Sequence, residues 1–288
     1  MPSVWNPKVS IIIPVYNGAN YVNEAIDSAL TQTYPYIEVI VVNDGSCDEG
    51  ETERIALSYG DRIKYIKKQN GGVSSALNEG IRNMTGDYFS WLSHDDVYGP
   101  DKIRHQIESL AEFPDKKAVA LCAHCFINEN SARLTKKSLA RYADGIHEWQ
   151  TALRELLKNG SFCGCALLLP KTVFEDCGFF HEGLRFSQDM LMWMEIFLHG
   201  YSLVYNANED VRSRIHGKQV TETARKLFHK DSLAISEFVI ARLIKISDEK
   251  NNYLYLFAKR NAKYGNREVV KACLKKGKMM HLLYLVLC

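Results

Sequence analysis

The sequence predicts an α/β fold with a mixed central sheet, followed by a helical region. Apolar, β-branched runs alternate with amphipathic segments over the first 112 residues. This alternation requires right-handed crossovers and a largely parallel sheet. Polar clusters stand at the ends of the apolar runs, and such sheets bind ligands at the carboxyl ends of their strands. We therefore expect these clusters to meet above one edge of the sheet.

The first half is expected over residues 1–112. Its opening strand, residues 9–16, is a near-continuous apolar run typical of a strand covered on both faces. Pro14 lacks an amide proton and is expected to end the hydrogen-bond ladder of that strand. Later strands and helices follow in alternation. Strands are predicted at 37–42, 63–66 and 87–92, and helices at about 20–33, 47–59, 73–83 and 102–112.

The second half is expected over residues 113–220 and a C-terminal helical region over 221–288. Residues 128–144 are polar and irregular, which is typical of a mobile loop. A long amphipathic helix is predicted from Thr221 to Ser247, with Ile235 and Phe238 on its apolar face. The remaining elements are predicted from shorter apolar patterns. They are strands at 118–126 and 162–169, and helices at 149–158 and 188–199.

The bulk composition describes an ordinary globular protein, with 46% hydrophobic and 24% charged residues. A formal net charge of +2 gives no general argument for nucleic acid as a partner. We find no signal peptide and no apolar run of the roughly 20 residues that span a bilayer. The eight cysteines are scattered through apolar runs, which fits reduced thiols. The expected location is therefore cytoplasmic.

The last apolar run, Met279 to Leu287, follows several lysines. A basic segment beside an apolar one can rest on an anionic membrane surface, here the inner face of the plasma membrane. It can equally pack on the chain's own core or on a second copy. Peripheral membrane contact and a homodimer through the C-terminal helices both stay open.

Asp95 and Asp96 are adjacent carboxylates just after the strand predicted at 87–92. One carboxylate would suffice to cap the helix that follows. Two neighbouring carboxylates repel each other unless a cation compensates their charge. Hard oxygen ligands suit Mg²⁺ and Mn²⁺, so this segment predicts a divalent metal site.

Other candidate residues have two readings each. Asp44 is a turn former or a hydrogen-bond acceptor for a ligand. Gly71-Gly72 is a turn or a phosphate site at a helix start. Asp189 lies in an N-cap region or is a general base. Arg214 and His216 belong to a basic cluster that is either solvated surface or a site for a diphosphate.

Two cysteine motifs raise the question of zinc. Cys122-Ala123-His124-Cys125 has zinc-like spacing, and Cys163-Gly164-Cys165 follows later. Metal knuckles usually place turn residues between their ligands, whereas these motifs lie in apolar, strand-like runs. Buried thiols are the favoured interpretation, and a structural zinc site is the alternative.

The ordered set of segments resembles the family 2 glycosyltransferases (GT2), inverting enzymes of the GT-A fold, over about the first 220 residues. Val9 to Asn17 is similar to the family's opening strand, and Ile40 to Ser46 to its base-binding strand end. Asn70 to Asn78 resembles its next loop and helix. Ser93 to Asp96 stands where the family usually carries an Asp-x-Asp-Asp metal motif, with Ser93 replacing the first acid.

Two later segments extend the likeness. Ser187-Gln188-Asp189 is similar to the family's Glu-Asp motif, which supplies the catalytic base, with Gln188 in place of the glutamate. Arg214-Ile215-His216 resembles the arginine and histidine near the end of the catalytic domain. The resemblance thus implies a nucleotide-sugar-binding half over 1–112 and an acceptor-binding half, with the base, over 113–220.

The resemblance implies a metal-dependent hexosyltransferase with a nucleotide-diphosphate sugar, most simply a UDP-sugar, as donor. Asp189 would be the catalytic base. Asp95 and His216 would bind Mn²⁺ or Mg²⁺, and Asp96, Gln188 and Arg214 would face the diphosphate or the acceptor. The remaining implied contacts are with the nucleotide. They are Pro14, Tyr16, Asn17, Asp44, Ser46, Asn70, Asn78, Ser93, His94 and Asp95.

The implied acceptor is a hydroxyl of a glycan, lipid-linked or protein-linked, in the synthesis of polysaccharide or another cell-surface glycan. One alternative is a nucleotidyltransferase, although Tyr16-Asn17-Gly18 lacks the basic residues expected after the first strand of such an enzyme. The other is an inactive, glycan-binding relative, which the replacement at Ser93 keeps open.

Overall fold

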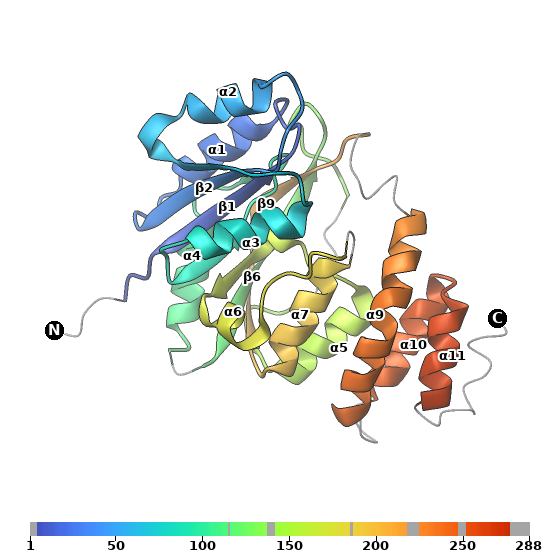
Figure 1. The fold of residues 1–288 in the computed structure, drawn as a ribbon. Helices are drawn as coiled ribbons and strands as arrows, with labels where there is room; N and C mark the ends of the chain where they lie inside the picture. Colours follow the sequence, from blue (N-terminus) through green and yellow to red (C-terminus); the bar gives the residue numbers. More distant parts are fainter. Residues whose placement is uncertain are drawn as a thin grey trace.

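The computed structural model describes residues 5–114, 116–136, 142–184, 187–217, 225–246 and 252–276. These residues form a mixed sheet of nine strands (Figure 1). Eight strands are hydrogen-bonded in the order β3-β2-β1-β4-β8-β6-β9-β5, and β7 pairs with β9. The strands are β1 Val9–Val15, β2 Ile37–Asn43, β3 Lys64–Lys67, β4 Tyr88–Trp91, β5 Val97–Tyr98, β6 Ala118–Ile127, β7 Gly145–His147, β8 Leu167–Pro170 and β9 Ser202–Arg214.

The first half is the alternating, parallel unit that the sequence predicts. β3, β2, β1 and β4 pair in parallel, so their carboxyl ends lie along one edge. β8 reverses direction, since it is antiparallel to both β4 and β6. β6 then runs parallel to β9. The expected mixed sheet is therefore confirmed.

Pro14 lies inside β1 and does not end it. β1 pairs with β2 as far as Val15↔Asn43, whereas its pairing with β4 ends at Ile12↔Trp91. The Ile12 carbonyl accepts a hydrogen bond from the Leu92 amide on the β4 side. Backbone groups of alternate residues in a strand point to the same neighbouring strand, so Pro14, like Ile12, faces β4. The pairing with β4 has already ended at Ile12, and the amide that Pro14 lacks therefore has no partner to lose. The prediction that Pro14 ends the ladder is wrong for this reason.

Two strands of the second half differ from their predictions. Residues Gly164–Ala166 form a 3-10 turn, so β8 begins at Leu167 and not at Phe162. β9 runs for 13 residues and corresponds to none of the strands predicted above. Its polar middle, Asn206 to Asp210, coincides with irregular pairing to β6. A bulge therefore carries polar residues that break the alternation on which strand prediction depends.

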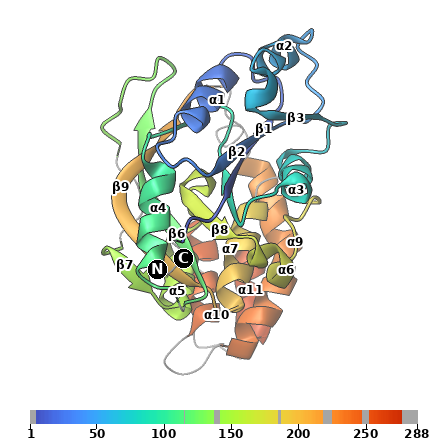
Figure 2. The same ribbon diagram turned by 90° about the vertical axis from the view of Figure 1, so that its left-hand side faces the viewer.

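The helices cover both faces of the sheet. Figure 2 shows α1 and α4 on one face and α3 and α6 on the other. Their bounds agree with the predicted segments within a few residues, and α6 is an addition. The helices are α1 Val22–Leu30, α2 Glu51–Leu57, α3 Val73–Asn83, α4 Lys102–Ala111, α5 Trp149–Asn159, α6 Thr172–Cys177, α7 Gln188–Leu198, α9 Arg225–Ile246, α10 Tyr253–Lys263 and α11 Arg267–Lys276.

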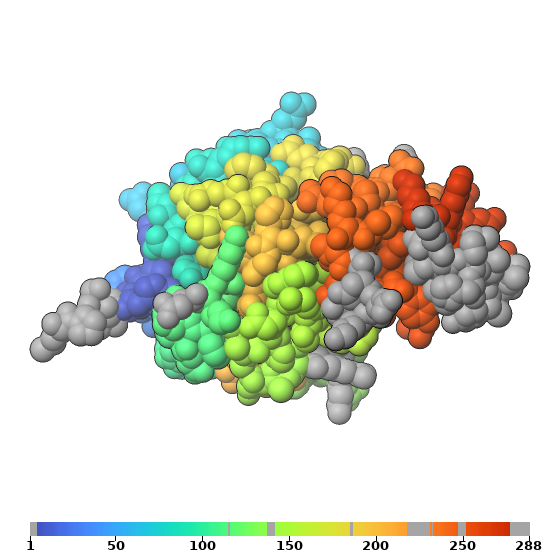
Figure 3. Space-filling model, turned by 90° about the horizontal axis from the view of Figure 1, so that it is seen from below, coloured from blue at the N-terminus to red at the C-terminus, as the bar shows by residue number. Residues whose placement is uncertain are grey.

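The C-terminal helices α9, α10 and α11 pack on one another, and α10 packs on α5. Figure 3 shows this orange-to-red region beside the yellow-green and yellow parts of the chain. Their apolar residues join the main core, among them Ile240, Phe257 and Val270. Ile235 is buried as predicted, but Phe238 is 43% exposed and does not belong to the buried face. Arg242 of α9 pairs with Glu195 of α7 at 3.4 Å. The helical region is thus attached to the second half by both apolar and ionic contacts.

None of the helices in the described residues is long and apolar enough to cross a membrane. The apolar run 279–287, on which the membrane expectation depends, lies outside the described residues.

Arg214, the last residue of β9, ties several segments together from a fully enclosed position. Its side chain is 0% exposed, and its guanidinium lies 4.3 Å from the centre of the Tyr21 ring. The guanidinium donates to protein oxygens on three segments: the turn after β4, the loop after β6 and α1. These oxygens are the carbonyls of Asp95 (2.8 Å), Asn128 and Glu129 (3.2 Å each), the Ser131 hydroxyl (2.9 Å) and the Glu24 carboxylate (2.9 Å).

Replacing Arg214 with methionine should lower the free energy of unfolding by about 3–5 kcal/mol. The change leaves several carbonyl oxygens inside the protein without a donor, and such losses are strongly destabilising. Chemical denaturation followed by circular dichroism measures the effect. Arg212→Met is the matched control, because Arg212 is exposed two residues earlier on the same strand. Equal denaturation midpoints for the two variants would contradict this role.

Candidate functional site

The ends of β1 and β2 form one polar cluster. The Asn17 amide donates to the Ser46 hydroxyl at 2.9 Å, and the Asn17 side-chain oxygen accepts from the Cys47 amide at 2.8 Å. Tyr16 lies beside them, with its hydroxyl 3.4 Å from the Cys47 sulfur and its side chain 45% exposed. Asn17 adopts a positive φ of 49°, which turns the chain out of the strand. The reciprocal bonds therefore present an exposed aromatic ring above the sheet edge.

Asp44, at the end of β2, is buried and organises the loop before α3. Its carboxylate accepts from the Gly71 amide (3.0 Å) and the Gly72 amide (2.7 Å), and it pairs with Lys68 at 2.7 Å. The amides that would form a phosphate site at this helix start are thus already bonded to Asp44. This contact favours the turn reading of the glycine pair.

The end of β4 joins the same edge through His94. A side chain at Gly18, just after β1, would lie only 2.5 Å from the His94 ring, so glycine is required for this close approach. Burial lowers the pKa of His94, which favours its neutral form. The three strand ends thus converge, as the sequence predicts.

Asp95 and His216 form a paired, partly exposed group beside His94. The Asp95 Oδ2 lies 3.1 Å from the His216 Nε2, and the two side chains are 16% and 11% exposed. A carboxylate oxygen and an imidazole nitrogen at this separation, both reachable from solvent, fit a divalent cation such as Mn²⁺. The Asp95 carbonyl is held by Arg214, which fixes the backbone of the motif.

Asp96 is turned inward and is bonded differently from its neighbour. Its Oδ1 accepts from the Arg214 amide at 2.8 Å, and the Cys165 thiol lies 3.3 Å from its Oδ2. Burial, and then the adjacent Asp95 charge, raises the pKa of Asp96 well above its usual value. The two neighbouring carboxylates therefore avoid repulsion partly by having different partners.

Ser93, which replaces an acid of the family pattern, contacts a cysteine. Its amide donates to the Cys165 sulfur at 3.2 Å, and its hydroxyl lies 3.4 Å from the same atom. An acidic side chain at position 93 would bring a third negative charge beside Asp96 and the thiol. The neutral hydroxyl avoids that repulsion.

Asp189 stands at the start of α7, on the second half of the protein. The Ser161 hydroxyl donates to its Oδ2 at 2.5 Å. Burial raises the pKa of Asp189, while the hydrogen bonds from Ser161 and the Met190 amide and the charge of Arg260 lower it. A carboxylate with a raised pKa at a helix start has the properties of a general base. The neighbouring Gln188 is buried, and its side-chain oxygen has no hydrogen-bond partner among the residues that the structure describes.

Arg260 reaches the Asp189 region from α10. Its guanidinium is 2.9 Å from the Met190 sulfur and fills the space beside Gly160, where a side chain would meet it at 2.8 Å. Burial lowers the pKa of Arg260 and the charge of Asp189 is among the groups that raise it. The C-terminal helices thus supply a cation to the neighbourhood of the candidate base.

Three predicted contacts lie in the interior, away from the polar cluster. Asn78 is 1% exposed and bonds the backbone of Phe180 and the Glu182 carboxylate, so it joins α3 to the loop before α7. Pro14 is buried within β1, and the Arg214 guanidinium is enclosed. Their predicted contact with a ligand stays a prediction. Asn70 is exposed, with its amide beside Gly45 at the end of β2.

Several site residues escaped the sequence reasoning, namely Cys47, Ser161 and Arg260. A cysteine in a loop, a serine before a strand and an arginine in a late helix carry no pattern of their own. The zinc-like spacing at 122–125 does not form a site, because Cys122 and Cys125 are three residues apart on a strand and so point to opposite faces.

Comparison with known proteins bears on these observations. The family model described as "Glycosyl transferase family 2" matches residues 10–178. An uncharacterized glycosyltransferase of Rickettsia felis is 42% identical over 282 residues, which cover 94% of this chain and 45% of that protein. The chain thus spans less than half the length of that relative.

Two solved structures share the fold. Crystal structures of S. aureus TarS residues 1–349 include a complex with UDP-GlcNAc, which matches with a TM-score of 0.70 at 18% identity and covers 88% of this chain and 71% of that one. The mannosyltransferase PcManGT from Pyrobaculum calidifontis, in complex with GDP-Man and Mn²⁺, matches with a TM-score of 0.62 at 17% identity, covering 95% and 74%. With the matched family model and the mixed α/β architecture described above, this chain belongs to glycosyl transferase family 2 and has a GT-A type fold.

Proposed function

We propose that this glycosyltransferase is an inverting, metal-dependent enzyme that moves a hexose from a UDP-sugar to a hydroxyl of a glycan, lipid-linked or protein-linked acceptor. The observation that carries this proposal is that the candidate nucleotide and metal ligands lie on one element set and the candidate base on another. An edge cluster of Tyr16, Ser46, His94 and Asp95 lies at the carboxyl ends of β1, β2 and β4. The carboxylate of Asp189 comes from the second half of the protein, at the start of α7, and is held by Ser161.

The edge cluster is suited to a nucleotide. The exposed ring of Tyr16 can stack on a base, while Asn17, Ser46 and Ser93 offer polar groups to base and ribose. Asp44 acts through the loop of residues 68–72, which its carboxylate holds. The complex of TarS with UDP-GlcNAc supports a uridine nucleotide as the donor.

Asp95 and His216 would hold the cation. When bound, a divalent cation neutralises charge on the departing diphosphate. The hard oxygen and imidazole donors of this pair suit that ion, and the complex of PcManGT with GDP-Man and Mn²⁺ supports a metal requirement. Arg214 positions Asp95 by holding its carbonyl, and Asp96 and Gln188, both buried, would act on the diphosphate or the acceptor side only through the residues that they support.

Asp189 would accept the proton of the acceptor hydroxyl. The freed oxygen then bonds to the anomeric carbon from the face opposite the diphosphate, and the carbon–oxygen bond to the diphosphate breaks with its electron pair. A single displacement of this kind inverts the carbon. Ser161 orients the Asp189 carboxylate, and burial keeps it basic enough to take the proton. A polysaccharide or other cell-surface glycan is the acceptor class we propose.

Replacing Asp189 with asparagine should lower the transfer rate about 10²–10⁴-fold, the usual contribution of a general base. UDP binding should persist, because Asp189 lies outside the edge cluster. Transfer from a panel of UDP-sugars and calorimetry with UDP measure the two effects. Asp61→Asn, at an exposed position far from α7, is the control. A turnover of Asp189→Asn close to that of the control would remove Asp189 from this role.

Replacing Asp95 with alanine should abolish the part of UDP affinity that depends on Mn²⁺. The variant lacks the carboxylate that would bind the ion, whereas Tyr16 and Ser46 remain. Calorimetric titration of UDP with and without Mn²⁺ gives the difference, with Asp61→Ala as control. If Mn²⁺ improves UDP binding to Asp95→Ala as much as to the parent, Asp95 is not a metal ligand.

The rate of transfer should fall on the acid side at a higher pH than an ordinary aspartate would give, because burial raises the pKa of Asp189 and only its ionised form accepts a proton. Arg260→Gln removes a positive charge that lowers this pKa, so the acid limb of kcat should move to still higher pH. Lys259→Gln makes the same charge change at an exposed neighbouring position and should leave the limb in place. An unmoved limb in Arg260→Gln would exclude this electrostatic coupling.

A further inference from the structure

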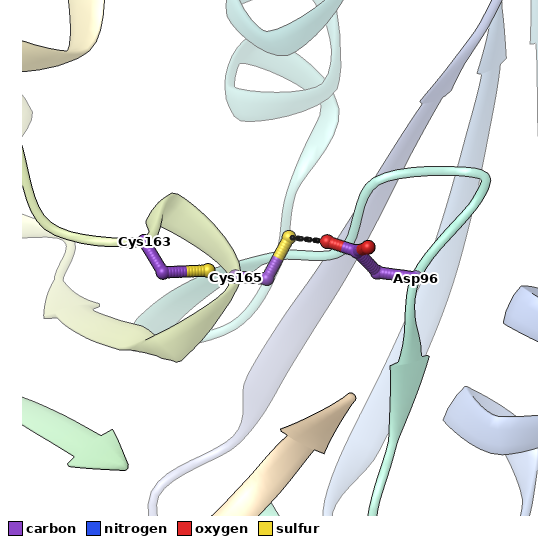
Figure 4. Close-up of side chains that lie close together, drawn as sticks. All are labelled: Asp96, Cys163 and Cys165. Atoms are coloured by element: carbon purple, nitrogen blue, oxygen red, sulfur yellow. Dashed lines mark hydrogen bonds between the residues drawn. The ribbon is translucent and has the colours of Figure 1, made fainter. Parts of the chain in front are cut away.

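Behind the edge cluster, three side chains that can bind metal lie together. Asp96 comes from the turn between β4 and β5, and Cys163 and Cys165 come from the 3-10 turn before β8. Their ligand atoms all lie within 4.8 Å of one another, and within the part of the chain that the structure describes this is the one such group of three or more. Figure 4 shows Cys165 between the other two, with its sulfur hydrogen-bonded to Asp96.

We propose that Asp96, Cys163 and Cys165 form a binding site for a thiophilic divalent cation, Zn²⁺ or a similar ion, separate from the proposed site at Asp95 and His216. Thiolate sulfur and carboxylate oxygen are both ligands that zinc uses in proteins. Zinc–sulfur bonds of about 2.3 Å place tetrahedral donors roughly 3.8 Å apart, so a small inward movement of the three side chains suffices. Water would complete the coordination.

Groups outside the cluster already donate toward each ligand. The Arg214 amide bonds the Asp96 Oδ1, the Ser93 amide bonds the Cys165 sulfur, and the Ser213 hydroxyl lies 3.6 Å from the Cys163 sulfur. Such partners orient metal ligands and stabilise their negative charge. Donors therefore surround the site on its protein side.

The ligands also select the ion. Sulfur ligands favour Zn²⁺ over Mg²⁺ or Mn²⁺, which prefer oxygen. Binding converts each coordinating thiol to a thiolate, and the displaced protons pass to solvent. Because Asp96 adjoins Asp95 in the chain, an ion here would lie next to the proposed donor site without needing its ligands.

Cobalt replaces zinc at such sites and reports sulfur ligation by a charge-transfer absorption band. Titration of the reduced full chain with Co²⁺ should give this band at one ion per chain, and Zn²⁺ should displace it. Cys163→Ser and Cys165→Ser should each lose the band. Cys177→Ser, a half-buried cysteine on α6, should keep it. Absence of the band in the parent, or its survival in both variants, overturns the proposal.

A second measurement uses the parent protein alone, so it does not depend on whether the cysteine variants fold. In the parent protein, Zn²⁺ should slow alkylation of Cys163 and Cys165 at least 10-fold, as followed by mass spectrometry. The exposed Cys47, beside Tyr16, is the internal control and should react at an unchanged rate. Equal rates for Cys163 and Cys165 with and without Zn²⁺ overturn the proposal. Neither measurement uses transfer activity, so both are independent of the proposed function.

Discussion

The enclosed guanidinium of Arg214 is the interaction on which the geometry of the site depends. A buried arginine is tolerated only where its donors are matched by acceptors, and here those acceptors come from α1, from the turn after β4 and from the loop after β6. Its own amide holds Asp96 while its side chain holds the Asp95 carbonyl. One residue at the end of β9 thus fixes both acids of the motif, and it does so from the opposite half of the protein.

The two halves of the protein position their candidate site residues in different ways. The parallel strands bring Tyr16, Ser46 and His94 to one edge by topology alone, because the carboxyl ends of parallel strands coincide. Asp189 is placed by a helix start and by Ser161, with no strand involved. In the function proposed here, nucleotide and acceptor chemistry could therefore vary separately: the first would follow the sheet, and the second the packing of α5, α7 and α10.

Sequence patterns predicted the fold class, most elements and the meeting of the strand ends, because apolar periodicity and strand direction determine them. They did not predict the long β9, whose polar bulge hides the strand. They also could not tell which polar groups turn inward. Asn78 looked like a ligand contact, yet its partner Phe180 lies 102 residues away. Arg260 reaches the neighbourhood of Asp189 through tertiary packing, which leaves no local signal. The assignments of individual ligand contacts stay proposals, since only bound donor and acceptor can test them.

The placement of Arg260 has a consequence for how such chains diversify. With Asp189 in the role proposed for it, a helical appendage that lends a cation to the neighbourhood of this carboxylate would be part of the catalytic environment and not a detachable adaptor. Recombination that exchanged everything after β9 for an unrelated segment would keep the strands of the sheet. It would also remove Arg260, whose charge lowers the pKa of Asp189, and that pKa would rise. Evolution of a new appendage on this scaffold would therefore have to evolve a substitute counter-charge with it.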